Sequence, residues 1–144
     1  MKKPPLAKYD FSVIFDMDGV IVDSNPVHKK ALKLFCRRHG YHLTEADLND
    51  RIYGRSNKDW LPEFFQLDIL PEEYEKLAQE KEILFREMYE PIIQPIKGLI
   101  NFLENLSAHQ IACAIASSAP PENVEFTIQK PAPKNIFQLS FMRK

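Results

Sequence analysis

The feature that most constrains this chain is a short apolar run that ends in a pair of aspartates. Residues 11–15 read Phe-Ser-Val-Ile-Phe, and Asp16-Met17-Asp18-Gly19 follows at once. β-branched and aromatic residues favour a strand, and a continuous apolar run of this length is typical of a strand buried in a parallel sheet. Ligands of parallel α/β sheets bind beyond the carboxyl ends of the strands. The two aspartates are therefore expected at a binding edge.

Between residues 25 and 91 the hydrophobic pattern is helical throughout. Asn25 can cap a helix whose first position is Pro26, and Thr44 can cap a short second helix. Pro71 can start a long helix whose apolar side chains recur at helical spacing. The sequence therefore predicts an all-helical domain over residues 25–91.

A second strand pattern lies downstream of this domain. Residues 111–116 read Ile-Ala-Cys-Ala-Ile-Ala, end at Ser117-Ser118, and are followed by another helical pattern. This order of elements predicts an α/β fold: a strand, a helical insert, a helix, a second strand and a further helix. We expect a Rossmann-like parallel-sheet core built from residues 1–24 and 92–144, interrupted by the all-helical domain.

Composition limits the classes of partner. The 144 residues include 19 Lys and Arg against 20 Asp and Glu, which argues against a dedicated nucleic-acid or membrane-surface protein. The basic start of the chain lacks the apolar stretch of a signal peptide, and no apolar run reaches the length of a membrane span. The two cysteines, Cys36 and Cys113, lack metal-site spacing and fit a reducing compartment, so a cytoplasmic protein is expected.

The aspartate pair carries the candidate chemistry. Two carboxylates two residues apart can meet one cation where the backbone turns sharply, and Gly19 permits such a turn. Mg²⁺ prefers such oxygen ligands, one carboxylate can attack phosphorus, and the other can transfer protons. An EF-hand calcium loop is excluded, because a strand precedes the pair and Val27 stands where the bidentate Glu is needed. An ordinary acidic turn after a strand stays open as the alternative.

The string over residues 13–24, Val-Ile-Phe-Asp-Met-Asp-Gly-Val-Ile-Val-Asp-Ser, resembles the first motif of the haloacid dehalogenase-like hydrolases. Within that family it is similar to the branch of β-phosphoglucomutases and small sugar-phosphate phosphatases, whose helical cap is inserted directly after this motif. A looser resemblance extends over about residues 9–130. It implies Mg²⁺-dependent phosphoryl transfer from a small phosphorylated metabolite through an aspartyl-phosphate. Asp16 would be the nucleophile, Asp18 the general acid/base, and Asp16 with the Asp18 carbonyl would hold the metal.

The second motif of that family is an apolar strand ending in a Ser or Thr that binds the transferring phosphate. Residues 111–118 match it, with Ser117 at the key position and Ser118 after it. A hydroxyl and N–H groups that lead into a helix suit an anion, although the same residues can simply end a strand and approach a helix cap. Lys130 opens a string similar to the family's Lys-Pro-x-Pro, but too soon after Ser117 for a third strand to intervene. The string is therefore a chance match or follows a lost segment.

The helical domain contains a loop similar to the cap loop of the resembled branch. Gly54-Arg55-Ser56-Asn57 matches the position that reaches over the active site there and implies a role in substrate specificity. Arg55 or Lys58 is the candidate contact for a sugar hydroxyl or a second phosphate. The alternative is a solvated turn between two helices.

Other cap residues bear on the choice between mutase and phosphatase. His28 stands where the mutases have a histidine near the acid/base, although a histidine on the first turn of a helix is otherwise unremarkable. Leu32 stands where those enzymes commonly have Trp, and Asn57 where they commonly have Arg, which favours phosphatase chemistry. Trp60 and residues 64–65 are expected in the core of the cap.

The acidic motif that the family carries after a later strand is not found. Downstream of Ser118 the acidic residues are Glu122 and Glu125, both in a predicted helix. We therefore expect a core truncated at the C-terminus, in which residues 11–15 form an exposed edge that invites self-association. The rival hypothesis is a truncated chain that binds phosphate or a partner without turnover. Dehalogenase activity is a weaker third hypothesis, because dehalogenases usually lack an aspartate at the position of Asp18.

Overall fold

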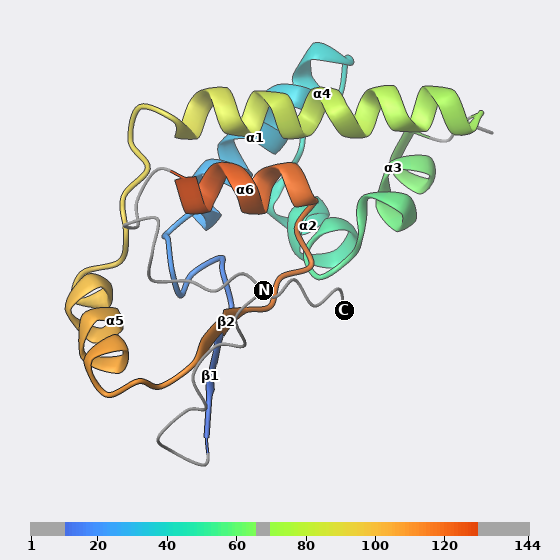
Figure 1. The fold of residues 1–144 in the computed structure, drawn as a ribbon. Helices are drawn as coiled ribbons and strands as arrows, with labels where there is room; N and C mark the ends of the chain where they lie inside the picture. Colours follow the sequence, from blue (N-terminus) through green and yellow to red (C-terminus); the bar gives the residue numbers. More distant parts are fainter. Residues whose placement is uncertain (1–10, 66–69, 130–144) are drawn as a thin grey trace. The chain divides into compact units, whose positions relative to one another are not determined.

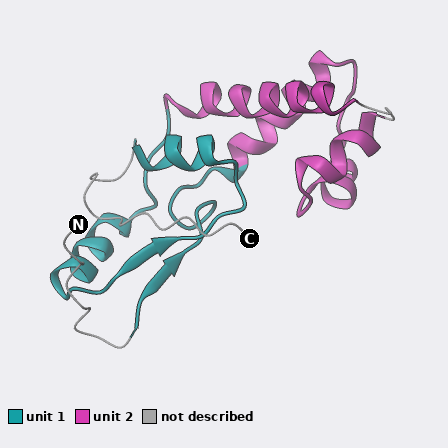
Figure 2. Cartoon of the chain, turned by 45° about the vertical axis from the view of Figure 1, so that its right-hand side comes forward, with its two compact units in different colours: residues 1–25, 92–144 teal, residues 26–91 magenta. Residues whose placement is uncertain are grey.

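The computed structural model describes residues 11–65 and 70–129 (Figure 1). In chain order its elements are β1 (Val13–Phe15), α1 (Asn25–Arg38), α2 (Glu45–Asp47), the π-helix η1 (Leu48–Ile52), α3 (Asn57–Phe65), α4 (Pro71–Tyr89), α5 (Leu99–Ala108), β2 (Cys113–Ile115) and α6 (Pro121–Gln129). The chain divides into two compact units, which are described separately (Figure 2). Unit 1 contains residues 1–25 and 92–144, and unit 2 contains residues 26–91.

The sheet of unit 1 is formed by β1 and β2, which pair in parallel. Val13 lies opposite Cys113 and Phe15 opposite Ile115. The backbone N–H of Ala116 donates to the carbonyl of Phe15 at 2.9 Å, so the pairing reaches the carboxyl ends of both strands. Both strands were predicted in the right place, and both are shorter than the apolar runs that contain them.

Helix α5 covers part of this sheet. Leu99, Leu103 and Leu106 recur at helical spacing and are buried. The ring of Phe102 meets the ring of Phe15 edge-on, with the centroids 6.1 Å apart. Parallel strands need such a crossover between them, and α5 provides it.

Unit 2 has an aromatic core. Phe35 is fully buried, and its ring packs edge-on against Phe65 with the centroids 5.8 Å apart. Trp60 and Phe64 are also buried and contact each other, with the ring centroids 6.2 Å apart. The prediction that Trp60 and residues 64–65 form core is therefore confirmed.

The predicted second helix begins as expected and then changes type. The Thr44 hydroxyl accepts from the N–H of Asp47, and the Asp47 carboxylate accepts from the N–H of Thr44, which is a capping box. After α2 the chain continues as a π-helix, in which the N–H of Tyr53 donates to the carbonyl of Leu48 at 2.8 Å. π-Helical turns are rare in proteins, and those that do occur are often found at functional sites.

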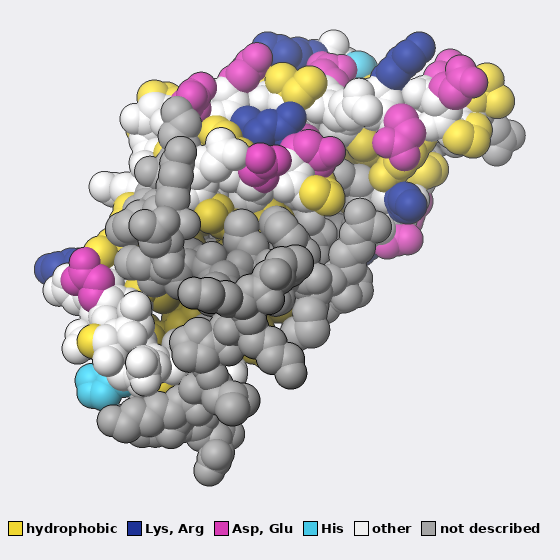
Figure 3. Space-filling model, viewed as in Figure 1, with side chains coloured by type: hydrophobic (Ala, Val, Ile, Leu, Met, Phe, Trp, Pro, Cys, Tyr) yellow, Lys and Arg dark blue, Asp and Glu magenta, His cyan; other side chains and the backbone are white. Residues whose placement is uncertain are grey.

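Charged side chains of both signs are interspersed over α4 on the face shown in Figure 3. Within residues 11–65 and 70–129, no helix is both long and apolar enough to cross a bilayer. The formal net charge of the chain is -1.

Candidate functional site

The parallel register brings two polar loops to one edge of the sheet of unit 1. The pairing of Phe15 with Ile115 means that the chain leaves both strands at the same level. Asp16 directly follows β1, and Ser117 follows β2 after Ala116. The sequence-predicted residues of both motifs therefore lie at the carboxyl ends of neighbouring strands, where parallel sheets bind ligands.

A tight backbone turn shapes the aspartate loop. The carbonyl of Met17 accepts from the N–H of Ile21 at 2.9 Å, and the N–H of Gly19 donates to the carbonyl of Val22 at 2.7 Å. Gly19 has a φ of +80°, and a Cβ there would lie 3.2 Å from the Asn25 side chain. The positive φ therefore favours glycine at this position, and a Cβ would also require the Asn25 side chain to shift by a few tenths of an ångström.

The two carboxylates of this loop have different surroundings. Asp16 is exposed, and one of its oxygens accepts from the N–H of Met17 at 2.8 Å. Asp18 is half-buried and accepts a short hydrogen bond from the hydroxyl of Ser24, which is fully buried. The open carboxylate can meet a ligand, while the other is oriented by the protein.

Ser24 was not among the predicted site residues. A serine just before a helix is usually read as a helix cap, and its Asp18 contact spans six residues of a turn. Its signal in the sequence is its place as the last residue of the string that carries the resemblance. The contact itself depends on the fold of the loop.

The second polar loop runs from β2 to α6. Ser117 is half-buried, and its hydroxyl accepts from the N–H of Ala119 at 3.1 Å. Ser118 is exposed, and α6 begins three residues later at Pro121. A hydroxyl and backbone N–H groups that precede a helix form an arrangement that suits an anion.

The donors at this edge fit a hard divalent cation in part. Asp16 and Asp18 offer carboxylate and carbonyl oxygens, which Mg²⁺ prefers, and its remaining positions accept water or phosphate. Within the described part of the chain there is no group of three or more His, Cys, Asp or Glu side chains that could hold a metal. Glu122 and Glu125 are exposed residues of α6.

In unit 2, the predicted specificity loop is held by its own hydrogen bonds. Arg55 donates to the carbonyls of Arg51 and Asp59 at 3.1 and 3.0 Å and pairs with Glu63 at 2.6 Å. The Ser56 hydroxyl donates to the Asp59 carboxylate at 2.6 Å. The Ser56 hydrogen bond lowers the pKa of Asp59, and the Arg55 hydrogen bond lowers the pKa of Glu63. Gly54 has a φ of +76°, so the turn itself selects glycine.

Asn57 is tied to α4. Its amide nitrogen donates to the carboxylate of Glu82 at 2.9 Å, and its amide oxygen accepts from the indole N–H of Trp60 at 3.2 Å. Glu82 is buried and pairs with Lys81 at 2.7 Å. The Ser56 and Asp59 pair and the hydrogen bonds of Asn57 explain why α3 begins at Asn57.

His28 lies flat against a core aromatic ring. Its imidazole stacks on Phe85 with ring centroids 3.7 Å apart and an interplanar angle of 5°. His28 is half-buried, and both residues belong to unit 2. The last predicted site residue, Lys130, lies outside the described residues.

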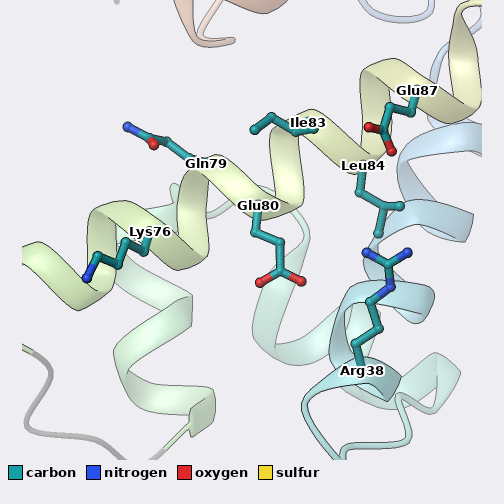
Figure 4. Close-up of a pocket in the computed structure, with 7 residues that line it drawn as sticks. All are labelled: Arg38, Lys76, Gln79, Glu80, Ile83, Leu84 and Glu87. Atoms are coloured by element: carbon teal, nitrogen blue, oxygen red, sulfur yellow. The ribbon is translucent and has the colours of Figure 1, made fainter.

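A pocket of about 320 Å³ lies between α1 and α4 of unit 2 (Figure 4). Its lining contains side chains of both charge signs and two aliphatic side chains. The lining residues are Arg38, Lys76, Gln79, Glu80, Ile83, Leu84 and Glu87. It contains none of the predicted site residues.

Comparison with known proteins identifies the family. The profile of the haloacid dehalogenase-like hydrolases matches residues 13–142. The chain belongs to this family. Its branch is that of the β-phosphoglucomutases and sugar-phosphate phosphatases.

Individual relatives agree with this assignment. The phosphorylated carbohydrates phosphatase of Thermotoga maritima is 31% identical over 76% of this chain and 50% of its own length. A family IA hydrolase of Entamoeba histolytica is 33% identical over 83% of this chain and 54% of that one, with a TM-score of 0.74. A β-phosphoglucomutase of Clostridium difficile shares the fold, with 21% identity, a TM-score of 0.71 and coverage of 92% and 60%.

These likenesses confirm the predicted fold class, an incomplete parallel-sheet core with an inserted helical region. The chain spans about half the length of the curated relatives it matches. The chain is thus a member of a phosphatase-type hydrolase family, and it corresponds to about half of the relative's sequence.

Proposed function

We propose that this chain carries the phosphoryl-accepting part of a Mg²⁺-dependent phosphatase that acts on a small phosphorylated carbohydrate. The observation that carries the proposal is the parallel register, which places the Asp16 loop and the Ser117 loop at one sheet edge. The relative from Thermotoga maritima, a phosphatase of phosphorylated carbohydrates, supports the substrate class. Leu32 and Asn57 replace residues common in the mutases, which favours hydrolysis over mutase chemistry.

In this proposal Asp16 is the nucleophile. Its exposed carboxylate attacks the phosphorus of the substrate, the bond to the leaving oxygen breaks, and an aspartyl-phosphate forms. Ser117 and the N–H groups that follow it bind the oxygens of the transferring phosphate. Water then attacks the phosphorus, which releases phosphate and restores the Asp16 carboxylate.

Asp18 moves the proton. It protonates the leaving oxygen of the substrate and later takes a proton from the attacking water. The buried Ser24 hydroxyl holds the Asp18 carboxylate in one orientation, which suits a group that must meet two different oxygens in turn. Ser24 therefore acts through Asp18 as a positioning residue.

Asp16 and the backbone carbonyl of Asp18 would hold Mg²⁺. When bound, the ion supplies charge neutralisation between the carboxylate and the phosphate oxygens. Both donors belong to the turn shaped by Gly19, so their spacing is set by the backbone.

In unit 2, we propose that the loop at Gly54-Arg55-Ser56-Asn57 and His28 shape the substrate side of a cap. The support is the resemblance of this loop to the cap loop of the branch. The hydrogen bonds of Arg55, Ser56 and Asn57 hold the loop in one conformation. A fixed loop keeps the residues next to it in place for recognition.

The test is phosphate release from p-nitrophenyl phosphate and a panel of sugar phosphates, with and without Mg²⁺. We expect Mg²⁺-dependent release that falls by on the order of 10⁴-fold or more in Asp16→Asn, because the nucleophile is lost. Circular dichroism of both proteins confirms that they are folded. Equal release by the two folded proteins would refute the assignment of Asp16.

A second candidate function is binding of phosphate without turnover. It is favoured by the sequence downstream of Ser118, where the acidic residues are Glu122 and Glu125, both in α6. In that case phosphate binds at Ser117 and Ser118 with no release of product. Titration calorimetry with inorganic phosphate, in protein that shows no phosphate release, would distinguish this function from the first.

We also propose that the chain associates with a second copy through β1. Within the described residues β1 pairs only with β2, and the side chains of Phe11 and Ile14 are 54% and 55% exposed. An apolar strand at the edge of a sheet is a template for pairing with another chain. Sedimentation velocity should show a dimer that Ile14→Lys dissociates, and a monomer at all concentrations would refute the proposal.

A further inference from the structure

We infer that the pocket between α1 and α4 binds a small zwitterion, an α-amino acid with an aliphatic side chain. The pocket lies within unit 2, and none of its lining residues belongs to the sites proposed for phosphoryl transfer or for the cap loop (Figure 4). The inference therefore goes beyond the proposed function and does not depend on it.

Two packed helices form the walls of this pocket. Just after α1, the Nε2 of His39 lies 2.9 Å from the Glu80 carboxylate on α4. In the first turn of α1, the ring of His28 stacks on Phe85 of α4, with the centroids 3.7 Å apart. The volume of about 320 Å³ therefore lies between two helices that contact each other at both ends of α1.

Side chains of opposite charge face each other in this pocket. Arg38 lies in the last turn of α1, and Glu87 points toward it from α4, with Leu84 between them (Figure 4). Both charged side chains are exposed, and within the described part of the chain neither makes an ion pair. Arg37 shares the last turn of α1, so the helix dipole accounts for a cation there but not for one that faces Glu87.

The other acidic group of the lining is already engaged. Lys76 lies four residues before Glu80, a spacing at which ion pairs usually form on a helix. Glu80 contacts His39 instead, and among residues 11–65 and 70–129 Lys76 has no ion-pair partner. Two cations, Arg38 and Lys76, and the Glu87 carboxylate are thus available to a ligand.

These charges select the class of ligand. A planar guanidinium binds a carboxylate through two N–H donors, and the Glu87 carboxylate can accept from an ammonium group. A phosphate group would meet the like charges of Glu80 and Glu87, and a neutral ligand would leave Arg38 and Glu87 without partners. A molecule with one carboxylate and one ammonium group satisfies both ends of the pocket.

The apolar part of the lining selects the side chain of the ligand. Leu84 is buried, whereas Ile83 beside it is 46% exposed among charged residues. An aliphatic group on the ligand would remove this apolar surface from water, which is favourable. A volume of about 320 Å³ lies at the lower end of the range for ligand pockets, so it fits an amino acid better than a larger metabolite.

A direct pair between Arg38 and Glu87 is a weak competitor for this ligand. Ion pairs between exposed side chains contribute little to stability, because water and salt screen them and two long side chains lose freedom. A zwitterion between them pairs both charges and also covers Ile83.

The experiment is titration calorimetry of the full wild-type chain with L-leucine, in a buffer without zwitterions. Two further ligands each lack one charge: 4-methylpentanoate lacks the ammonium group, and isopentylamine lacks the carboxylate. We expect leucine to bind, and each analogue to bind at least about tenfold more weakly through loss of a charge-assisted contact. No binding of leucine, or equal binding of all three ligands, would overturn the inference.

Four variants then locate the site. Arg38→Gln and Glu87→Gln should each weaken leucine binding about tenfold. Arg37→Gln and Glu75→Gln are the matched controls, because they remove the same charges from exposed positions of the same helices outside the pocket, and they should bind leucine as the wild type does. Equal affinities in the folded pocket variants and their controls would place leucine elsewhere and overturn the inference. Phosphate release from p-nitrophenyl phosphate tests the proposed function separately, since that assay contains no zwitterionic ligand.

Discussion

The aspartate loop of unit 1 and the Gly54-Arg55-Ser56-Asn57 loop of unit 2 use their polar groups in opposite ways. In unit 1 the turn is held by backbone hydrogen bonds, and the Asp16 side chain is left exposed. In unit 2 the side chains of Arg55 and Asn57 make the hydrogen bonds that hold the turn. The backbone hydrogen bonds of the first loop leave the Asp16 carboxylate available for chemistry, whereas the second loop uses most of its polar side chains to hold its own conformation.

Among the substitutions that test this difference between the two loops, those of Glu82 are expected to change the free energy of unfolding most. Glu82→Ala should lower the free energy of unfolding by about 3 kcal/mol, because Lys81 and Asn57 lose the acceptor they share in a buried site. Glu82→Gln keeps an acceptor for Asn57 and should cost about half as much. Denaturation with urea measures the difference.

An exposed glutamate of the same helix serves as the control. Glu87→Ala should leave the free energy of unfolding within about 0.5 kcal/mol of the wild type. A loss at Glu82 no greater than the loss at Glu87 would contradict the view that side chains hold unit 2.

A smaller effect on stability is expected at Ser24, in unit 1. Ser24→Ala removes the hydrogen bond to Asp18 and should cost about 1 kcal/mol. If Asp18 is the acid/base, phosphate release should fall by roughly tenfold, because the carboxylate is no longer oriented. Assays of phosphate release, compared at equal concentrations of folded protein, measure this decrease. Ser107→Ala, an exposed serine of α5, is the control and should change neither quantity.

The smallest effect concerns the surface of unit 2 in acid. Hydrogen bonds from Lys29 and Lys33 lower the pKa of Glu45 to about 2 from its ordinary 4.5. Because the pKa is lower in the folded state, Glu45 stabilises the protein above its ordinary pKa. This contribution is lost as the pH falls toward about 2.

The measurement is the melting temperature of wild type and Glu45→Gln from about pH 5 to about pH 2. The wild type should be the more stable at the upper end, and the difference should shrink as the pH falls. A difference that stays constant over this range would mean that the lysine contacts do not act through the charge of Glu45.

Much of the candidate site was predictable from the sequence because it depends on local patterns. The apolar run before Asp16, the glycine at position 19 and the serines after residues 111–116 are contiguous signals, and parallel strands align their carboxyl ends. Thr44 is likewise a local signal, and it caps α2 as expected. The strand ends differ by two residues or fewer from the predicted runs, because pairing decides where a strand stops.

The partners of the polar side chains were decided only by the tertiary structure. Asn57 meets Glu82, which lies 25 residues away, and His28 meets Phe85 across unit 2. The sequence shows that Arg55 and Lys58 are both cations near a glycine, but only the folded chain pairs Arg55 with Glu63. A hydrogen bond depends on distances of a few tenths of an ångström between groups on different elements, and no pattern along the chain encodes that spacing.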